Sequence, residues 1–191
     1  MLVLTKAQRE QCQAFLDELY RWNERVNLTT VPAELAWQRH VEESVELAKA
    51  LLPTDKSVVD IGSGGGIPGL VLAILAPTVR LCLVEGDSRK AGFLMHAAGL
   101  LDLPNLEVVA QRAEVAGALE LHHGAYDLAV SRAAGPPQRV LGWAFPFLRA
   151  GGRVLLMAGD QSPEDELAVV VADLGGSMFE AGPGLIGATK L

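Results

Sequence analysis

The chain has little cysteine, few aromatic residues, no long apolar run and no surplus of positive charge. Its two cysteines, Cys12 and Cys82, stand far apart and show no spacing typical of a metal site or a disulfide framework. Although 50% of the 191 residues are hydrophobic, no apolar run approaches the roughly 20 residues that a membrane-spanning helix needs. These absences exclude a disulfide scaffold and a helical membrane protein, and they predict no metal site.

The charge balance also limits the partners. The 23 acidic residues outnumber the 16 basic ones, which gives a formal net charge of −7. Such a balance counts against a large nonspecific nucleic-acid surface, although a local basic patch is compatible with it. The first residues, Met1 to Lys6, lack a basic region followed by a long apolar core, so we expect no secretory signal, no membrane partner and a cytoplasmic protein.

The most informative stretch is residues 57–69, Ser-Val-Val-Asp-Ile-Gly-Ser-Gly-Gly-Gly-Ile-Pro-Gly. An apolar run ends in a glycine cluster, and an apolar segment of helical character follows, which predicts a strand, a tight turn and a helix. Residues without a Cβ let a ligand lie against the peptide groups, and the free N–H groups at the start of the helix favour an anionic group. The stretch therefore predicts a ligand-binding loop.

Two classes of ligand fit this loop. Gly64, Gly66 and Gly69 have the G-x-G-x-x-G spacing of dinucleotide-binding proteins. Read from Asp60 onward, the stretch is similar to motif I of the S-adenosylmethionine (AdoMet) methyltransferases, in which an acidic residue orients the loop and the amino acid moiety of the ligand. AdoMet is favoured because Asp60 precedes the glycines and because Pro68 is expected just inside the helix, where its missing N–H is tolerated.

The rest of the chain predicts an α/β fold, with a mostly parallel sheet and short connections. We expect strands at 57–62, 79–85, 106–110, 126–131, 152–158, 178–181 and within 185–191, with a helix from Pro163 before the last two. Seven strands ending in a hairpin indicate a Rossmann-like AdoMet-dependent methyltransferase fold. Two helices, 4–28 and 32–52, precede the first strand. We therefore divide the chain into an N-terminal helical extension, 1–56, packed on a methyltransferase domain, 57–191.

Polar residues follow the predicted strands, where such a fold binds its ligands. Glu85 ends the second strand, in a position to accept hydrogen bonds from the ribose hydroxyls of AdoMet or NAD. Residues 112–114, Arg-Ala-Glu, follow the third strand, the usual place for contacts to an adenine. Residues 131–133, Ser-Arg-Ala, follow the fourth and face the expected position of the reactive methyl group.

Six ordered motifs carry a resemblance to a known family. They are Trp22-Asn23-x-x-Val26-Asn27-Leu28-Thr29, His40-x-x-x-Ser44, the loop from Asp60 to Gly69, Arg89-Lys90-x-x-Phe93-Leu94, Arg112-x-Glu114 and Ser131-Arg132-Ala133. The combination, from about Leu16 to Ala158, resembles the glucose-inhibited division protein B family, the bacterial guanine-N7 methyltransferases of small-subunit ribosomal RNA.

The resemblance implies roles at the matching positions. Together with the residues argued above, the expected AdoMet contacts are Asp60, Gly62, Gly64, Ile67, Glu85, Ala113, Glu114 and Arg132. It implies that Arg112 and Arg132 act on the RNA or the reacting guanine, and that His40 and Ser44 shape the floor of the pocket. The implied partner is 16S ribosomal RNA, free or in the 30S particle, and we expect a monomer.

The chemistry that the resemblance implies requires no general base, because guanine N7 has an available lone pair that attacks the sulfonium methyl in line. The protein has to align the reactants. In agreement with this, the fourth predicted strand is not followed by a cysteine motif for covalent pyrimidine methylation, and residues 135–137, Gly-Pro-Pro, lack the aromatic residue of the exocyclic-amine methylases. We hypothesise that Arg132 stacks on the guanine or donates a hydrogen bond to its O6.

The chain departs from the family pattern at two places. Glu43 stands where the family usually has Asp, and residues 158–160, Ala-Gly-Asp, stand where Lys-Gly is common. The closing hairpin is also short. Two alternatives therefore stay open: an AdoMet-dependent methyltransferase of a small molecule, and a non-catalytic protein that binds AdoMet or a dinucleotide.

Overall fold

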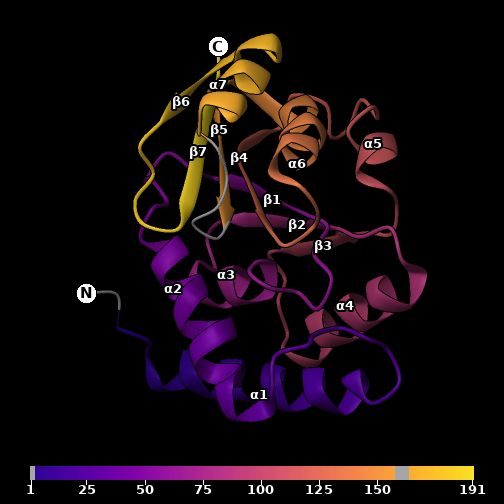
Figure 1. Ribbon diagram of the computed structural model, residues 1–191. Coiled ribbons are helices and arrows are strands. Elements are labelled where there is room, and N and C mark those ends of the chain that lie inside the picture. Colours follow the sequence, from indigo (N-terminus) through magenta and orange to yellow (C-terminus); the bar gives the residue numbers. More distant parts are fainter. Residues whose placement is uncertain (1–2, 158–163) are drawn as a thin grey trace.

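The fold is a twisted sheet between two layers of helices (Figure 1), and the computed structural model describes residues 3–157 and 164–191. Seven strands pair in the order β3-β2-β1-β4-β5-β7-β6. β7 is antiparallel to β5 and β6, and the other neighbouring strands are parallel. The strands are β1 (Ser57–Ile61), β2 (Arg80–Val84), β3 (Leu106–Val109), β4 (Tyr126–Arg132), β5 (Leu148–Met157), β6 (Gly176–Phe179) and β7 (Leu185–Lys190). The predicted α/β class with a seven-stranded, mostly parallel sheet is confirmed.

The helices divide between the two faces of this sheet (Figure 1). The α-helices are α1 (Lys6–Asn23), α2 (Glu43–Ala48), α3 (Gly69–Leu75), α4 (Ser88–Leu100), α5 (Ala113–Ala116), α6 (Pro137–Ala144) and α7 (Glu164–Asp173). Two 3₁₀ segments, Ala33–Leu35 and Phe145–Phe147, and one π-helical turn, Trp37–Glu42, complete the set within the described residues. Helices α1 to α4 cover one face, and α5 to α7 cover the other.

Alternate residues of the central strands pack into the two halves of the core, one on each face of the sheet. In β1, Val58 packs in the cluster that contains Leu70 of α3, whereas Val59 packs in the cluster that contains Leu141 of α6. Because successive side chains of a strand point to opposite faces, a strand covered on both sides needs a continuous apolar run. This requirement explains why residues 58–61 are apolar except for Asp60.

The N-terminal segment shares the core of the first face. Phe15 of α1 is fully buried in the same cluster as Phe93 of α4. Nearby, the buried carboxylate of Glu18 accepts hydrogen bonds from Trp22 Nε1 at 2.9 Å and from His96 Nε2 at 2.8 Å. These contacts attach α1 to α4, and the division of the chain at residue 56 stays a prediction.

The first predicted helix, 4–28, is too long, because α1 ends at Asn23. The Asn23 side chain accepts hydrogen bonds from the N–H groups of Leu28 at 2.8 Å and Thr29 at 3.0 Å, and it donates to the Thr29 carbonyl at 3.0 Å. A side chain that satisfies three backbone groups offers the chain an alternative to further helical turns. The Trp-Asn motif therefore builds a loop.

The second predicted helix, 32–52, is also wrong as one helix, since it comprises the 3₁₀ segment, the π-helical turn and α2. Pro68 occupies the cap before α3 and not its first turn. β5 begins at Leu148, four residues before the predicted start, and β6 begins at Gly176. The predicted helix start at Pro163 and the departure at 158–160 lie outside the described residues.

Two further properties concern partners. No helix in residues 3–157 and 164–191 is long and apolar enough to span a bilayer. In the same part of the chain, no group of three or more His, Cys, Asp or Glu side chains is placed to hold a metal ion.

Candidate functional site

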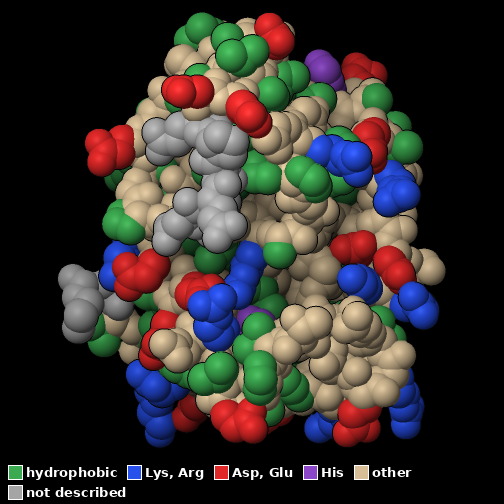
Figure 2. Space-filling model, in the orientation of Figure 1, with side chains coloured by type: hydrophobic (Ala, Val, Ile, Leu, Met, Phe, Trp, Pro, Cys, Tyr) green, Lys and Arg blue, Asp and Glu red, His purple; other side chains and the backbone are tan. Residues whose placement is uncertain are grey.

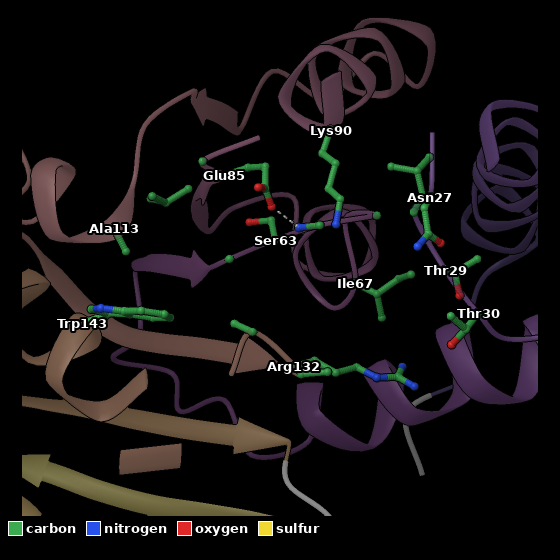
Figure 3. A pocket seen from close by; sticks show the side chains of 18 of the residues that line it. Asn27, Thr29, Thr30, Ser63, Ile67, Glu85, Lys90, Ala113, Arg132 and Trp143 are labelled. Atoms are coloured by element: carbon green, nitrogen blue, oxygen red, sulfur yellow. Dashed lines mark hydrogen bonds between the residues drawn. The ribbon is translucent and has the colours of Figure 1, made fainter. Parts of the chain in front are cut away.

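A cavity of about 470 Å³ lies at the carboxyl ends of β1, β2, β3 and β4. The strand order reverses between β1 and β4, and open α/β sheets bind ligands in the crevice at such a point. The segments that follow these strands line the cavity, and so do residues 27–31, His40, Lys90 and Trp143. We call it the cofactor cavity (Figure 3). It brings together all the predicted site residues except Asp60 and Ser44.

The glycine loop forms the cavity wall after β1. Gly62, Gly64 and Gly66 have positive φ angles of 68°, 54° and 83°. A Cβ at Gly62 would lie 2.7 Å from the Cβ of Ala134, so this position has no room for a side chain. Ile67 lines the same cavity. The loop thus presents backbone to the cavity, as its glycines predict.

Asp60 lies beneath the loop and not in the cavity wall. Its side chain is fully buried, and its Oδ2 accepts a hydrogen bond from the N–H of Gly69 at 3.1 Å. Its Oδ1 has no hydrogen-bond partner within the described residues. Burial raises the pKa of Asp60 to about 7. Asp60 thus ties the loop to the start of α3 from outside the cavity lining, and its contact with a ligand stays a prediction.

Glu85 is held rigidly in the middle of the cavity wall. Its Oε2 accepts a hydrogen bond from the N–H of Gly64 at 2.7 Å (Figure 3), and its Oε1 accepts one from the N–H of Asp87 at 2.7 Å. A carboxylate fixed in this way keeps lone pairs for a ligand that donates hydrogen bonds. The geometry suits the ribose hydroxyls expected at this strand end.

Trp143 and Ala113 lie at one end of the cofactor cavity (Figure 3). Ala113 is the first residue of α5, and Arg112 and Glu114 beside it also line the wall. Trp143 was not predicted from the sequence, because it belongs to α6, outside every motif. An aromatic ring beside a small side chain leaves a flat apolar space, which suits a planar heterocycle.

Arg132 closes the opposite end of the cavity, and its guanidinium points toward Thr30 (Figure 3). Its Nη2 lies 3.0 Å from Glu43 Oε2, and its Nη1 donates to the carbonyl oxygen of Arg39. The other oxygen of Glu43, Oε1, lies 2.8 Å from Arg39 Nη1. Glu43, one of the two departures from the family pattern, thus bridges two arginines. Arg112, the second candidate arginine, is exposed.

His40 fixes the loop that forms this end of the cavity. Its Nε2 lies 3.2 Å from Thr29 Oγ1, which also accepts the N–H of Val31. Burial, and secondly the positive charge of Arg132, lower the pKa of His40 to about 4, so the ring is neutral at pH 7. Ser44 is buried behind it and donates to the His40 carbonyl at 2.6 Å. His40 therefore lines the cavity, whereas Ser44 supports His40.

The π-helical turn accounts for the position of Arg39 and His40. Both residues belong to this widened turn, and both of their carbonyl oxygens accept side-chain hydrogen bonds, from Arg132 and from Ser44. Short π-helical turns occur often at functional sites. Helical periodicity in the sequence gives no signal for such a turn.

Few of the basic side chains converge on the cavity. Lys90 of α4 points into it (Figure 3). Arg21 pairs with Glu18 at 2.7 Å and Arg89 pairs with Asp87 at 3.0 Å. Figure 2 shows basic and acidic side chains mixed across this face and no continuous basic surface. Two of the basic side chains that could have formed a patch at the cavity are instead paired with acidic side chains.

Comparisons with known proteins agree on one family. The family model described as "GidB: rRNA small subunit methyltransferase G" matches residues 8–174. A relative from Roseiflexus castenholzii, named ribosomal RNA small subunit methyltransferase G, is 38% identical over 95% of this chain and 79% of its own length. A protein of the same name from Paramagnetospirillum magneticum is 42% identical over 83% of this chain and 74% of its own length.

Solved structures share the fold at lower identity. An AdoMet-dependent methyltransferase from Aquifex aeolicus superposes with a TM-score of 0.59 at 14% identity, covering 91% of this chain and 96% of its own. TYW2 from M. jannaschii, solved in complex with AdoMet, gives a TM-score of 0.57 at 16% identity, covering 78% of this chain and 73% of its own. At such identities the likeness shows the fold alone.

Proposed function

The chain belongs to the GidB family, described as rRNA small subunit methyltransferase G, and on that premise we propose that it transfers a methyl group from AdoMet to N7 of a guanine in 16S ribosomal RNA. The observation that carries the proposal is the cofactor cavity, in which a glycine loop, a fixed carboxylate and an arginine line one space at the ends of four strands. The proposal includes a monomer that works in the cytoplasm.

The cavity lining suits AdoMet. Gly62 and Gly64 line the cavity and have no Cβ, so the loop holds its backbone against the space that a ligand would fill. In our proposal, Gly62, Gly64 and Ile67 hold the methionine part, Glu85 accepts the ribose hydroxyls, and Ala113, Glu114 and Trp143 surround the adenine. When bound, AdoMet supplies an electrophilic methyl group on a sulfonium centre.

The side chains around the cavity suit a reaction that needs no base. Guanine N7 brings its own lone pair, so the protein has to hold the base in line and exclude water. His40 is neutral at pH 7, and its Nε2 faces Thr29. Asp60 is buried under the loop. Arg132, at the edge of the cavity, is the residue that we assign to the guanine, through stacking or a hydrogen bond to O6.

The test is methyl transfer from labelled AdoMet to deproteinised small-subunit RNA and, in parallel, to assembled subunits, both from cells that lack this activity. We expect label on at least one substrate, in the form of N7-methylguanine after nucleoside digestion. If AdoMet binds and neither substrate is labelled, the proposal fails. Turnover of a metabolite would then support the small-molecule alternative, and binding without any transfer would support the non-catalytic one.

A further inference from the structure

A second cavity, of about 810 Å³, lies next to the cofactor cavity along the same edge of the sheet. Its lining comes from α2, from the ends of β4 and β5 and from the turn between β6 and β7. The lining includes Arg39, Glu43, Leu47, Lys49, Met157 and Leu185. Among the described residues, the two cavities share Arg132 and Ala133. The two cavities therefore meet at the end of β4.

We propose that this second cavity binds the target guanosine nucleotide of the RNA, flipped out of its stack, so that the N7 edge of the base reaches past Arg132 and Ala133 to the methyl group in the cofactor cavity. This inference rests on the proposed function and names its substrate site. In an A-form helix guanine N7 faces a deep, narrow major groove that side chains cannot enter, so an enzyme reaches it in a loop or by flipping the base into a pocket.

The lining has the chemistry of a nucleotide site. Leu47, Met157 and Leu185 supply apolar surface against which a base can lie. Arg39 and Lys49 line the second cavity alone, and a phosphate group would compete there with the acids that they pair with, Glu43 at 2.8 Å and Glu46 at 2.6 Å. Arg39 and Arg132 already converge on the Glu43 carboxylate, at 2.8 Å and 3.0 Å. Two guanidinium groups that meet at one anion have the geometry for a phosphate, or one of them for the O6 of a guanine whose N7 stays free to react.

The backbone where the two cavities meet is strained. Ala133 has a φ angle of +54°, in the left-handed region that residues with a Cβ rarely adopt. Such strain tends to persist where the surrounding structure fixes a functional geometry. This backbone conformation places Ala133 where the two cavities meet, directly after Arg132, which also lines both.

The first test maps where a guanine nucleotide contacts the protein. The full chain, saturated with AdoMet, is irradiated with 6-thioguanosine 5′-monophosphate, and the cross-linked peptides are identified by mass spectrometry. We expect cross-links at Met157 or at residues 181–185, removed by excess guanosine monophosphate and not by cytidine monophosphate. Cross-links confined to residues 27–31 or Lys90, or no competable cross-link, would overturn the inference.

The second test uses a charge reversal that touches only the second cavity. Lys49→Glu is expected to lower kcat/KM for RNA about tenfold or more, with the Kd for AdoMet unchanged, because a phosphate contact is replaced by repulsion. The matched control is Lys56→Glu, at the amino end of β1, which is expected to behave like the wild type. Equal kcat/KM values for the two variants would contradict the inference.

The two failures can be distinguished. If the wild type labels RNA and both tests are negative, the proposed function stands and the nucleotide site is wrong. If the wild type labels no RNA, the proposed function is wrong, and the cross-linking result still decides whether the second cavity takes a purine nucleotide.

Discussion

The two ends of the cofactor cavity are built in different ways. The loop end consists of residues 60–69 and Glu85, and its contacts are mainly backbone groups fixed by positive φ angles and by one carboxylate. At the arginine end, side chains meet from positions far apart in the sequence: Arg132 contacts Glu43 and the carbonyl of Arg39. We therefore expect the loop end to be sensitive to changes of shape, and the arginine end to be sensitive to changes of charge.

The largest effect is expected at the loop end, from Gly62→Val. The new side chain would meet Ala134 and would have to adopt a φ of +68°. We expect AdoMet binding to be lost and the free energy of unfolding to fall by about 1–3 kcal/mol. Titration calorimetry measures the binding of AdoMet, and denaturant unfolding measures the free energy of unfolding.

The matched control is Gly92→Ala in α4, where an added Cβ meets nothing within 4 Å. This variant should bind AdoMet normally and gain about 0.5–1 kcal/mol, since alanine is the better helix former. Normal AdoMet binding by Gly62→Val would show that the loop does not hold the ligand.

The next largest effect is expected at the arginine end, from Arg132→Ala. Loss of a side chain that holds the reacting base should lower kcat for methyl transfer by about 100-fold, with the Kd for AdoMet changed much less. Arg149→Ala is the control, because Arg149 also pairs with an acid, Asp127 at 2.6 Å, but lies at the other end of the sheet. Unchanged methylation by Arg132→Ala would refute its assigned role.

Trp143→Ala tests the part of the cavity that the sequence did not reveal. Stacking of a base on an aromatic ring contributes about 1–3 kcal/mol, so the Kd for AdoMet should rise roughly tenfold to hundredfold. Trp143→Phe should recover part of this loss. As a control, Trp37→Ala removes a ring that packs under Arg9, outside the cavity, and should leave the Kd unchanged.

The loop end could be predicted from the sequence more fully than the arginine end. The strands and the glycine loop were predictable because their signals, apolar runs and residues without a Cβ, lie within short windows. The π-helical turn was not, because the side chain of Arg132, 93 residues along the chain from Arg39, contributes to it. Trp143 was missed for a similar reason, since only the folded chain brings α6 to the cavity.

Asp60→Asn tests how the loop is supported, through the dependence of stability on pH. The folded protein holds the Asp60 proton up to a pKa of about 7, whereas the unfolded chain loses it in the usual carboxyl range. This contribution is therefore fully present at low pH and is lost as the pH rises through 7. From pH 6 to pH 8 the wild type should lose about 1.4 kcal/mol more than the variant. Denaturant unfolding of both proteins at the two pH values measures these losses. Equal losses of unfolding free energy in the wild type and the variant would disprove the expected difference.

The smallest effect, from Ala133→Gly, separates strain from function. Glycine adopts a φ of +54° without the Cβ penalty but loses more entropy on folding, so the net gain in stability should be below about 1 kcal/mol. Asp102→Gly is the matched control: its φ is +49°, and it lies in the turn after α4, outside both cavities. Both variants should unfold at slightly higher denaturant, and only Ala133→Gly should lower kcat for RNA, because it loosens the backbone where the two cavities meet. If methyl transfer by the two variants were the same, the strain at Ala133 would be structural and would have no part in the reaction.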